Sequence, residues 1–154
     1  MIVWMLIGVL SFTGNNQVTS SDIVQIHVPT VTVYAGKSSM ISIEVEVKQE
    51  YHIQANKVKD KFLIPTTVQV TSDEKIIMEK QIFPATKKFK LEGTDDFLDV
   101  HDGTFKISIP FKVKKGMQKG KYTLPAKLQY QACDSKTCLS PKIIDFVIQI
   151  EVIN

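Results

Sequence analysis

The 154-residue sequence lacks the motifs of several enzyme classes. It has no glycine-rich phosphate loop, no His-Glu-x-x-His and no Gly-x-Ser-x-Gly, which argues against phosphate-loop, zinc-peptidase and serine-hydrolase chemistry. Its three histidines, His27, His52 and His101, are scattered singly and form no His-x3-His pair. The acidic residues between Asp95 and Asp102 do not have the spacing of an EF-hand loop. We therefore expect no metal ion and no other cofactor.

The sequence also lacks a long helical period, an internal repeat and a low-complexity linker. Its six prolines and seven glycines are dispersed, and 44% of its residues are hydrophobic, which is enough for one packed core. Strand signals rich in β-branched residues recur at short intervals, in residues 23–33, 41–47, 51–53, 66–71, 75–83, 105–113, 122–132 and 144–152. Seven to nine such strands predict an all-β fold, an antiparallel β-sandwich.

No Asp, Glu, Lys or Arg precedes Asp22, and residues 1–10 are almost wholly apolar. Such a run is too short to span a bilayer and is typical of the h-region of a signal peptide. The n-region has no Lys or Arg and the cleavage site is not distinct, so an uncleaved anchor and a mis-assigned start codon remain alternatives. We expect residues 1–21 to be a signal peptide or leader, with residues 15–21 a flexible lead-in, and residues 22–154 to be one domain. We therefore expect a periplasmic or otherwise exported protein, with membrane contact only through an uncleaved leader.

The net charge of +3 indicates no strong preference for a charged partner. Five lysines between Lys112 and Lys121 gather around Gly116 and Gly120, and a basic turn of this kind can contact nucleic acid or acidic lipid. No aromatic residues interleave with these lysines for base stacking. We expect a solvated hairpin end and no binding of nucleic acid.

The only two cysteines, Cys133 and Cys138, are five positions apart. They lie between residues 122–132 and residues 144–152, and in both of these segments apolar residues alternate with more polar ones. This pattern predicts a β-hairpin with both cysteines at its exposed join, and it favours a redox role. A structural staple remains an alternative, although closing so short a loop removes only about 2 kcal/mol of denatured-state entropy. A zinc site is a second alternative. The bridge between the sheets of an immunoglobulin domain is excluded, because its cysteines lie far apart in sequence.

The charges near the cysteines predict which sulfur faces a partner. Lys136 lies two residues before Cys138 and favours its thiolate, whereas Asp134 follows Cys133 directly and disfavours its ionisation. Cys138 is therefore expected to have the lower thiol pKa and to face the partner, because the lower-pKa sulfur is also the better leaving group. The alternative is that residues 134–136 are only hydrophilic turn residues.

The cysteine block, residues 130–141 (YQACDSKTCLSP), resembles the active-site hairpin of the N-terminal periplasmic domain of the bacterial thiol:disulfide interchange protein DsbD, also called the disulfide bond corrector domain. Weaker matches precede this block in the order found in the family, at residues 51–56, 62–68, 83–84 and 102–105. The resemblance spans roughly residues 23–152. One departure is that a single proline, Pro141, follows the second cysteine, where the family often has two.

The resemblance implies an immunoglobulin-like sandwich in which Cys133 and Cys138 cycle between disulfide and dithiol. It implies electron transfer from a thioredoxin-like donor to periplasmic protein disulfides, as a component of a protein-disulfide reductase. The complete interchange protein also has a multi-span membrane domain and a thioredoxin-like domain, which do not fit in 154 residues, so the redox partner is expected to act in trans. A non-enzymatic binding module with a structural disulfide remains the alternative.

Residues 87–102 are the least regular segment, and we interpret them as a surface connection. In the family, a loop in a comparable place caps the cysteine pair with an aromatic side chain, so the resemblance implies that Phe89 or Phe97 has this role. Tyr51 and Tyr130 are candidates to line the same pocket. For each tyrosine, packing in the core or at an edge is the alternative.

Overall fold

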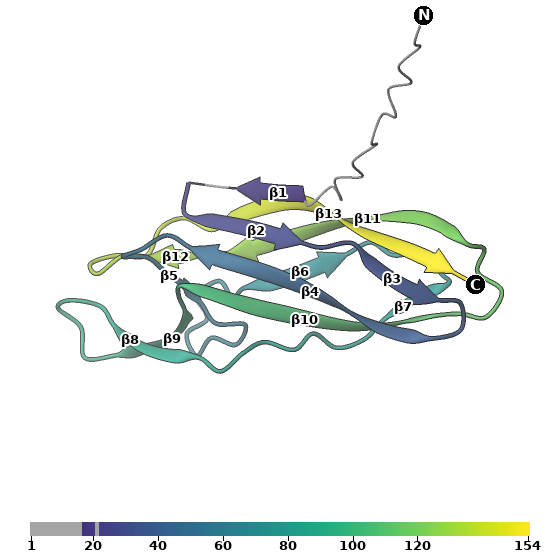
Figure 1. Cartoon of the computed structure of the whole chain (residues 1–154). Coiled ribbons are helices and arrows are strands. Elements are labelled where there is room, and N and C mark those ends of the chain that lie inside the picture. Colours follow the sequence, from purple (N-terminus) through teal and green to yellow (C-terminus); the bar gives the residue numbers. More distant parts are fainter. Residues whose placement is uncertain (1–16, 21) are drawn as a thin grey trace, which may run out of the picture.

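Strict alternation of apolar and polar residues produces the longest strands of the protein. The structure, a computed structural model, describes residues 17–20 and 22–154 (Figure 1). In these residues the chain forms strands and connecting loops, and no helix. In β4 (Ser38–Val47) and β10 (Thr104–Val113), every second side chain along the last seven residues is buried. Because successive side chains of a strand point to opposite faces, this period directs the isoleucines and valines to one core.

Two sheets form the sandwich. The first has the order β1-β2-β4-β10-β7 and adds β1 (Gln17–Ser20), β2 (Val24–Val28) and β7 (Ile76–Met78) to the two long strands. The second has the order β3-β13-β11-β6 and contains β3 (Val31–Tyr34), β13 (Lys142–Ile153), β11 (Gly120–Tyr130) and β6 (Thr67–Val70). All pairs are antiparallel except β3 and β13, which run parallel. The predicted all-β, immunoglobulin-like fold class is confirmed.

The inward faces of the two sheets share one hydrophobic core. Phe111 of the first sheet and Leu128 and Ile148 of the second are fully buried in it. Burial of each such side chain contributes roughly 1.5–3 kcal/mol. The core therefore gives the loops at the ends of the sandwich a rigid base.

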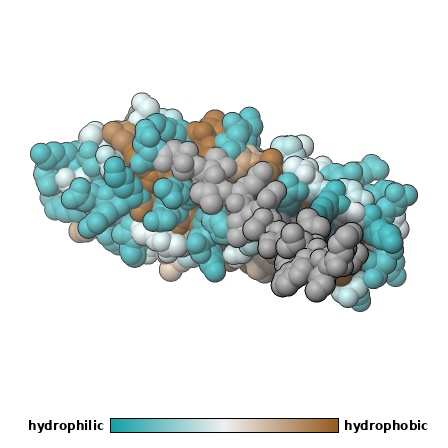
Figure 2. Space-filling model, turned by 45° about the horizontal axis from the view of Figure 1, so that its top comes forward, coloured by the Kyte–Doolittle hydropathy of each residue, from teal (hydrophilic) through white to brown (hydrophobic). Residues whose placement is uncertain are grey.

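A third, smaller sheet lies at one end of the sandwich, on the left in Figure 1. Its order is β12-β5-β9-β8, and its strands are β12 (Ala132–Cys133), β5 (His52–Gln54), β9 (Phe97–His101) and β8 (Lys87–Lys90). On the face seen in Figure 2, hydrophilic residues cover this end of the molecule.

The prediction of a surface connection at residues 87–102 was wrong, because this segment is the β8–β9 hairpin. Its register runs from Lys87↔Val100 to Lys90↔Phe97. The four residues of β8 are three lysines and one phenylalanine, so the sequence does not show an apolar face there. β9 also pairs with β5, and its Val100 is fully buried there. This second pairing stabilises β9 as a strand.

The strand predicted at residues 75–83 is shorter than expected. β7 ends at Met78, and Ile82 then forms an isolated bridge with Ser108, one residue out of the register that Phe111↔Met78 sets. Pro110 lies between these two pairs and has no N–H to donate to a neighbouring strand. The proline therefore explains why the ladder is interrupted.

The lysine-rich turn is not the end of a hairpin, because β10 and β11 belong to different sheets. The connection between them, residues 114–119, buries Met117 against the core. Lys114, Lys115 and Lys119 are exposed. The alternation on both sides predicted the strands correctly, but it contains no information on which sheet each strand joins.

The first sheet begins before residue 22, the predicted start of the domain. β1 lies within residues 15–21, which we expected to be a flexible lead-in, and pairs with β2 from Gln17↔Val28 to Ser20↔Gln25. The apolar run of residues 1–10 lies outside the described residues, so the signal peptide stays a prediction. In the part of the chain that the structure describes, no helix has the length and apolar character needed to cross a membrane.

Candidate active site

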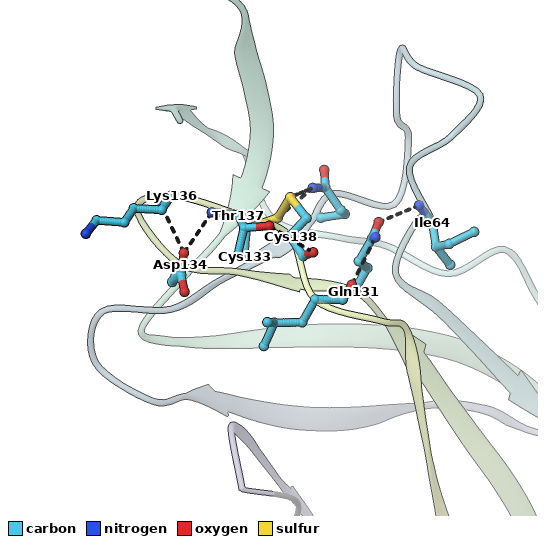
Figure 3. The surroundings of a disulfide bond; sticks show 9 residues. Ile64, Gln131, Cys133, Asp134, Lys136, Thr137 and Cys138 are labelled. Atoms are coloured by element: carbon cyan, nitrogen blue, oxygen red, sulfur yellow. Dashed lines mark hydrogen bonds between the residues drawn. A yellow bond between two sulfur atoms is a disulfide. The ribbon is translucent and has the colours of Figure 1, made fainter. Parts of the chain in front are cut away.

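Cys133 and Cys138 form a disulfide in the connection between β11 and β13 (Figure 3). The two cysteines also form an isolated antiparallel bridge, and their Cα atoms are 3.9 Å apart. β11 and β13 pair as far as Tyr130↔Lys142, so the predicted hairpin is confirmed. Among the described residues, no three His, Cys, Asp or Glu side chains lie together in a way that could hold a metal ion.

The two cysteines differ in exposure. Cys138 is half-buried, whereas Cys133 has an exposed fraction of 0%. The prediction that both cysteines lie at an exposed join was therefore wrong for Cys133. This residue belongs to β12, which pairs with β5 through Cys133↔His52, so it is part of a sheet and not of a turn. Cys138 is the more accessible of the two.

Asp134 closes the turn between the cysteines. Its Oδ1 accepts hydrogen bonds from the backbone N–H groups of Lys136 and Thr137, both at 2.8 Å, as Figure 3 shows. Its own N–H donates to the carbonyl of Thr137 at 3.0 Å. The hydrogen bonds from Lys136 N–H and then Thr137 N–H lower the pKa of Asp134, because they stabilise the carboxylate. Asp134 thus shapes the turn, and its influence and that of Lys136 on the cysteines stay predictions.

The side chain of Gln54, on β5, contacts both sulfurs. Its Nε2 donates to Cys133 Sγ at 3.1 Å and to Cys138 Sγ at 3.6 Å. Gln54 is fully buried, and its Oε1 has no hydrogen-bond partner among the described residues. Sequence reasoning included Gln54 only as part of the family match at residues 51–56 and gave it no role in the site. Gln54 lies 79 positions before Cys133, and only the pairing of β5 with β12 brings the two together.

A second glutamine, Gln131, fastens the cysteine loop to the neighbouring segment. Its Oε1 accepts a hydrogen bond from the N–H of Ile64 at 2.9 Å, and its Nε2 donates to the carbonyl of Leu139 at 3.1 Å (Figure 3). The N–H of Leu139 donates to the carbonyl of Ala132 at 2.8 Å. These bonds fix the chain on both sides of the disulfide. Sequence reasoning included Gln131 only as part of the cysteine block.

The β8–β9 hairpin lies beside the cysteine turn, at the same end of the sandwich in Figure 1. The backbone N–H of Glu92, in the loop of this hairpin, donates to the carbonyl of Ser135 at 2.9 Å. The ring of Phe89 stacks on the ring of His52, with centroids 3.9 Å apart and an interplanar angle of 25°. Opposite residues of an antiparallel pair project from one face, and His52 is opposite Cys133. Phe89 therefore covers a residue that lies on the face of the disulfide.

Phe97 lies on the other face of the small sheet. It is the register partner of Lys90, whose Nζ is 5.9 Å from the centroid of its ring, and it is 57% exposed. Lys90 follows Phe89 directly, and consecutive side chains of a strand point in opposite directions. Of the two aromatic candidates, the structure brings only Phe89 to the cysteine face. The capping role itself stays a prediction.

The two tyrosine candidates belong to the hydrophobic core or its edge. Tyr130 is 1% exposed and forms part of the core, and the partly buried Tyr51 packs against it. These positions agree with core packing, the alternative for both residues. A role in lining a pocket stays a prediction.

Charged groups flank the stacked pair of His52 and Phe89. His52 Nε2 lies 3.7 Å from Asp102 Oδ2, and Asp102 also forms an ion pair with Lys87. Lys87 is the first residue of β8 and Asp102 directly follows β9, so this ion pair joins the two strands at the base of the hairpin. The groups beside the stacked pair therefore include both an acidic and a basic side chain.

The sequence matches the family described as thiol:disulfide interchange protein DsbD, N-terminal, over residues 22–146. No curated protein sequence matches the chain. Among solved structures, the N-terminal periplasmic domain of ScsB from Proteus mirabilis is similar with a TM-score of 0.60 and 14% identity, covering 89% of this chain and 52% of that one. The chain thus spans about half the length of the ScsB structure.

A second similar structure is the N-terminal domain of DsbD from Neisseria meningitidis in its reduced form. Its TM-score is 0.46 at 13% identity, with coverage of 76% of this chain and 82% of that one. At 14% identity the ScsB structure shows the shared fold alone. The family match is the stronger finding, because it covers most of the chain and includes the cysteine turn. The chain belongs to the family of the N-terminal domain of the thiol:disulfide interchange protein DsbD.

Proposed function

We propose that the chain is an exported electron relay. In this proposal the Cys133–Cys138 disulfide accepts electrons from a thioredoxin-like donor and passes them to disulfides of periplasmic proteins. Family membership makes the chain a thiol-disulfide interchange domain. The observation that carries the proposal is the asymmetric disulfide, with Cys133 buried in a sheet and Cys138 half-exposed at a turn.

Reduction of the pair begins when a donor thiolate attacks Cys138 Sγ. An intermolecular S–S bond forms while the Cys133–Cys138 bond breaks, and Cys133 leaves as a thiolate. The second thiolate of the donor then attacks the donor sulfur of the mixed disulfide and releases Cys138 as a thiolate. The donor ends as a disulfide, and the pair has gained two electrons.

Oxidation of the pair repeats these steps on an acceptor. The Cys138 thiolate attacks a disulfide sulfur of the acceptor, and the other acceptor sulfur leaves as a thiolate that takes up a proton from water. The Cys133 thiolate then attacks Cys138 Sγ, re-forms the intramolecular disulfide and releases the second acceptor sulfur. Two electrons reach the acceptor, and Cys138 contacts the partner in both directions.

Phe89 and the β8–β9 hairpin serve as the cap of this site. Support comes from the stacking of Phe89 on His52 and from the hydrogen bond between Glu92 and Ser135. A cap is chemically useful, because a reactive dithiol in an oxidising compartment otherwise exchanges with unsuitable partners.

A redox titration of the folded protein tests the relay. The protein is equilibrated against mixtures of reduced and oxidised dithiothreitol, its thiols are alkylated, and the reduced fraction is read by mass. We expect reversible reduction of a folded protein at a potential above about −300 mV. If the disulfide resists reduction until the protein unfolds, it is structural and the chain is a binding module.

A further inference from the structure

The Gln54 amide lies against the bond that thiol exchange breaks. Its Nε2 donates to Cys133 Sγ at 3.1 Å and to Cys138 Sγ at 3.6 Å. The backbone of Gln54 is held on both sides, because its N–H donates to the carbonyl of Gln131 at 3.0 Å and its carbonyl accepts from the hydroxyl of Thr66. Thr66 and Gln54 are both fully buried. The amide is thus aimed at the sulfurs from a fixed strand.

The side-chain amide of Gln54 forms only weak hydrogen bonds while the disulfide is intact. A buried amide costs free energy unless it forms good hydrogen bonds, and a neutral sulfur is a weak acceptor. Gln54 Oε1 is also buried and has no hydrogen-bond partner among the described residues. The position of the side-chain amide is therefore not explained by a hydrogen bond to its oxygen. A thiolate is a far better acceptor, because a hydrogen bond to an ionised group is about twice as strong as a neutral one.

The buried position of Cys133 makes such a donor necessary. When a donor thiolate attacks Cys138, the electron pair of the broken S–S bond goes to Cys133 Sγ. Burial in apolar surroundings disfavours a thiolate and raises the pKa of the thiol, which makes the sulfur a poorer leaving group. Cys133 is fully buried, so its negative charge must be stabilised by the protein rather than by water.

We propose that Gln54 is a catalytic residue of the exchange and that its Nε2–H stabilises the thiolate that forms on Cys133. No proton leaves the amide in this step, and the same N–H stabilises Cys133 as the thiolate that later re-forms the disulfide. The inference rests on the proposed relay. Since the interaction is stronger after the S–S bond breaks than before, it accelerates reduction and shifts the equilibrium toward the dithiol.

Gln54→Met tests the proposal, because methionine has a similar length and no donor. We expect reduction of this variant by dithiothreitol to be about tenfold slower than that of the wild type, which corresponds to about 1.4 kcal/mol. In the reduced protein the pKa of the Cys133 thiol should rise, measured from the pH dependence of its alkylation in a Cys138→Ala background. Gln69→Met, on the exposed side of β6, is the matched control and should leave both quantities unchanged.

A second measurement uses the wild type and does not depend on whether the variant folds. The side-chain amide protons of Gln54 should shift downfield in the NMR spectrum when the disulfide is reduced and Cys133 ionises. If the wild type reduces reversibly and both the Gln54→Met rate and the amide signals stay unchanged, the inference is wrong and the relay stands. If the wild type resists reduction until it unfolds, the relay itself is wrong.

Discussion

His52 lies directly opposite Cys133 in the antiparallel pair of β5 and β12. This pairing explains why Cys133 is buried and why the ring of Phe89, stacked on His52, belongs to the surroundings of the disulfide. The same strand supplies Gln54 two residues later, on the same face as His52. A strand of only three residues thus aligns two of the side chains around the cysteine pair.

Removal of the Phe89 ring should open the site to unsuitable thiols. If Phe89 is the cap proposed above, we expect Phe89→Ala to be reduced severalfold faster than the wild type by glutathione, because the ring stacked on His52 is gone. Lost stacking on His52 should cost about 0.5–1.5 kcal/mol of unfolding free energy. Rapid mixing with glutathione, quenched by alkylation at set times, measures the rate of reduction.

Phe97→Ala is the matched control for the cap, since Phe97 lies on the opposite face of the same hairpin. It should leave the rate with glutathione unchanged. Equal rates in the Phe89→Ala and wild-type proteins would show that Phe89 does not shield the disulfide.

The difference in exposure between the cysteines predicts which one forms the mixed disulfide. In Cys133→Ser, Cys138 is activated with a thionitrobenzoate group and mixed with a thioredoxin whose second active-site cysteine is serine. The thioredoxin thiolate should displace thionitrobenzoate and form a stable intermolecular disulfide. Mass spectrometry detects this disulfide, and the absorbance of the released thionitrobenzoate anion gives the rate. Cys138→Ser, treated in the same way, should react far more slowly because Cys133 is buried. Equal rates for the two variants would contradict the assignment of Cys138 as the partner-facing sulfur.

Local patterns predicted the long strands and the cysteine turn, because side-chain period and turn chemistry are properties of a short segment. The alternation of residues 41–47 and 105–113 was enough to predict β4 and β10. The position of Cys138 next to a polar turn was also visible in the sequence.

Residues that meet through pairing of distant strands were not predictable. Gln54 and His52 approach the disulfide because β12, a strand of two residues, pairs with β5. Strand register depends on contacts far apart in the sequence, and two residues have no detectable period. The choice between Phe89 and Phe97 needed the register of the β8–β9 hairpin for the same reason.

Gln131→Ala should loosen both segments that the side chain of Gln131 connects. Loss of its two hydrogen bonds, from Ile64 and to Leu139, should lower the free energy of unfolding by about 1–3 kcal/mol. The backbone amide of Ile64 should exchange with deuterium faster than in the wild type. Urea unfolding and hydrogen exchange measure the two effects, with Gln69→Ala as the control. Unchanged protection of Ile64 would show that this contact is not maintained in solution.

Asp134→Ala should reduce stability in a pH-dependent way. The folded protein lowers the pKa of Asp134 below its ordinary value of 3.8, chiefly through the N–H groups of Lys136 and Thr137. A lowered carboxyl pKa contributes stability that is fully present above the unfolded pKa and is lost as the pH falls through the folded one. The wild type should therefore be more stable than Asp134→Ala at neutral pH, and the difference should shrink as the pH falls below 3.8. Urea unfolding of both proteins across this range measures it, and a difference that does not depend on pH would show that the carboxylate charge is not what holds the turn.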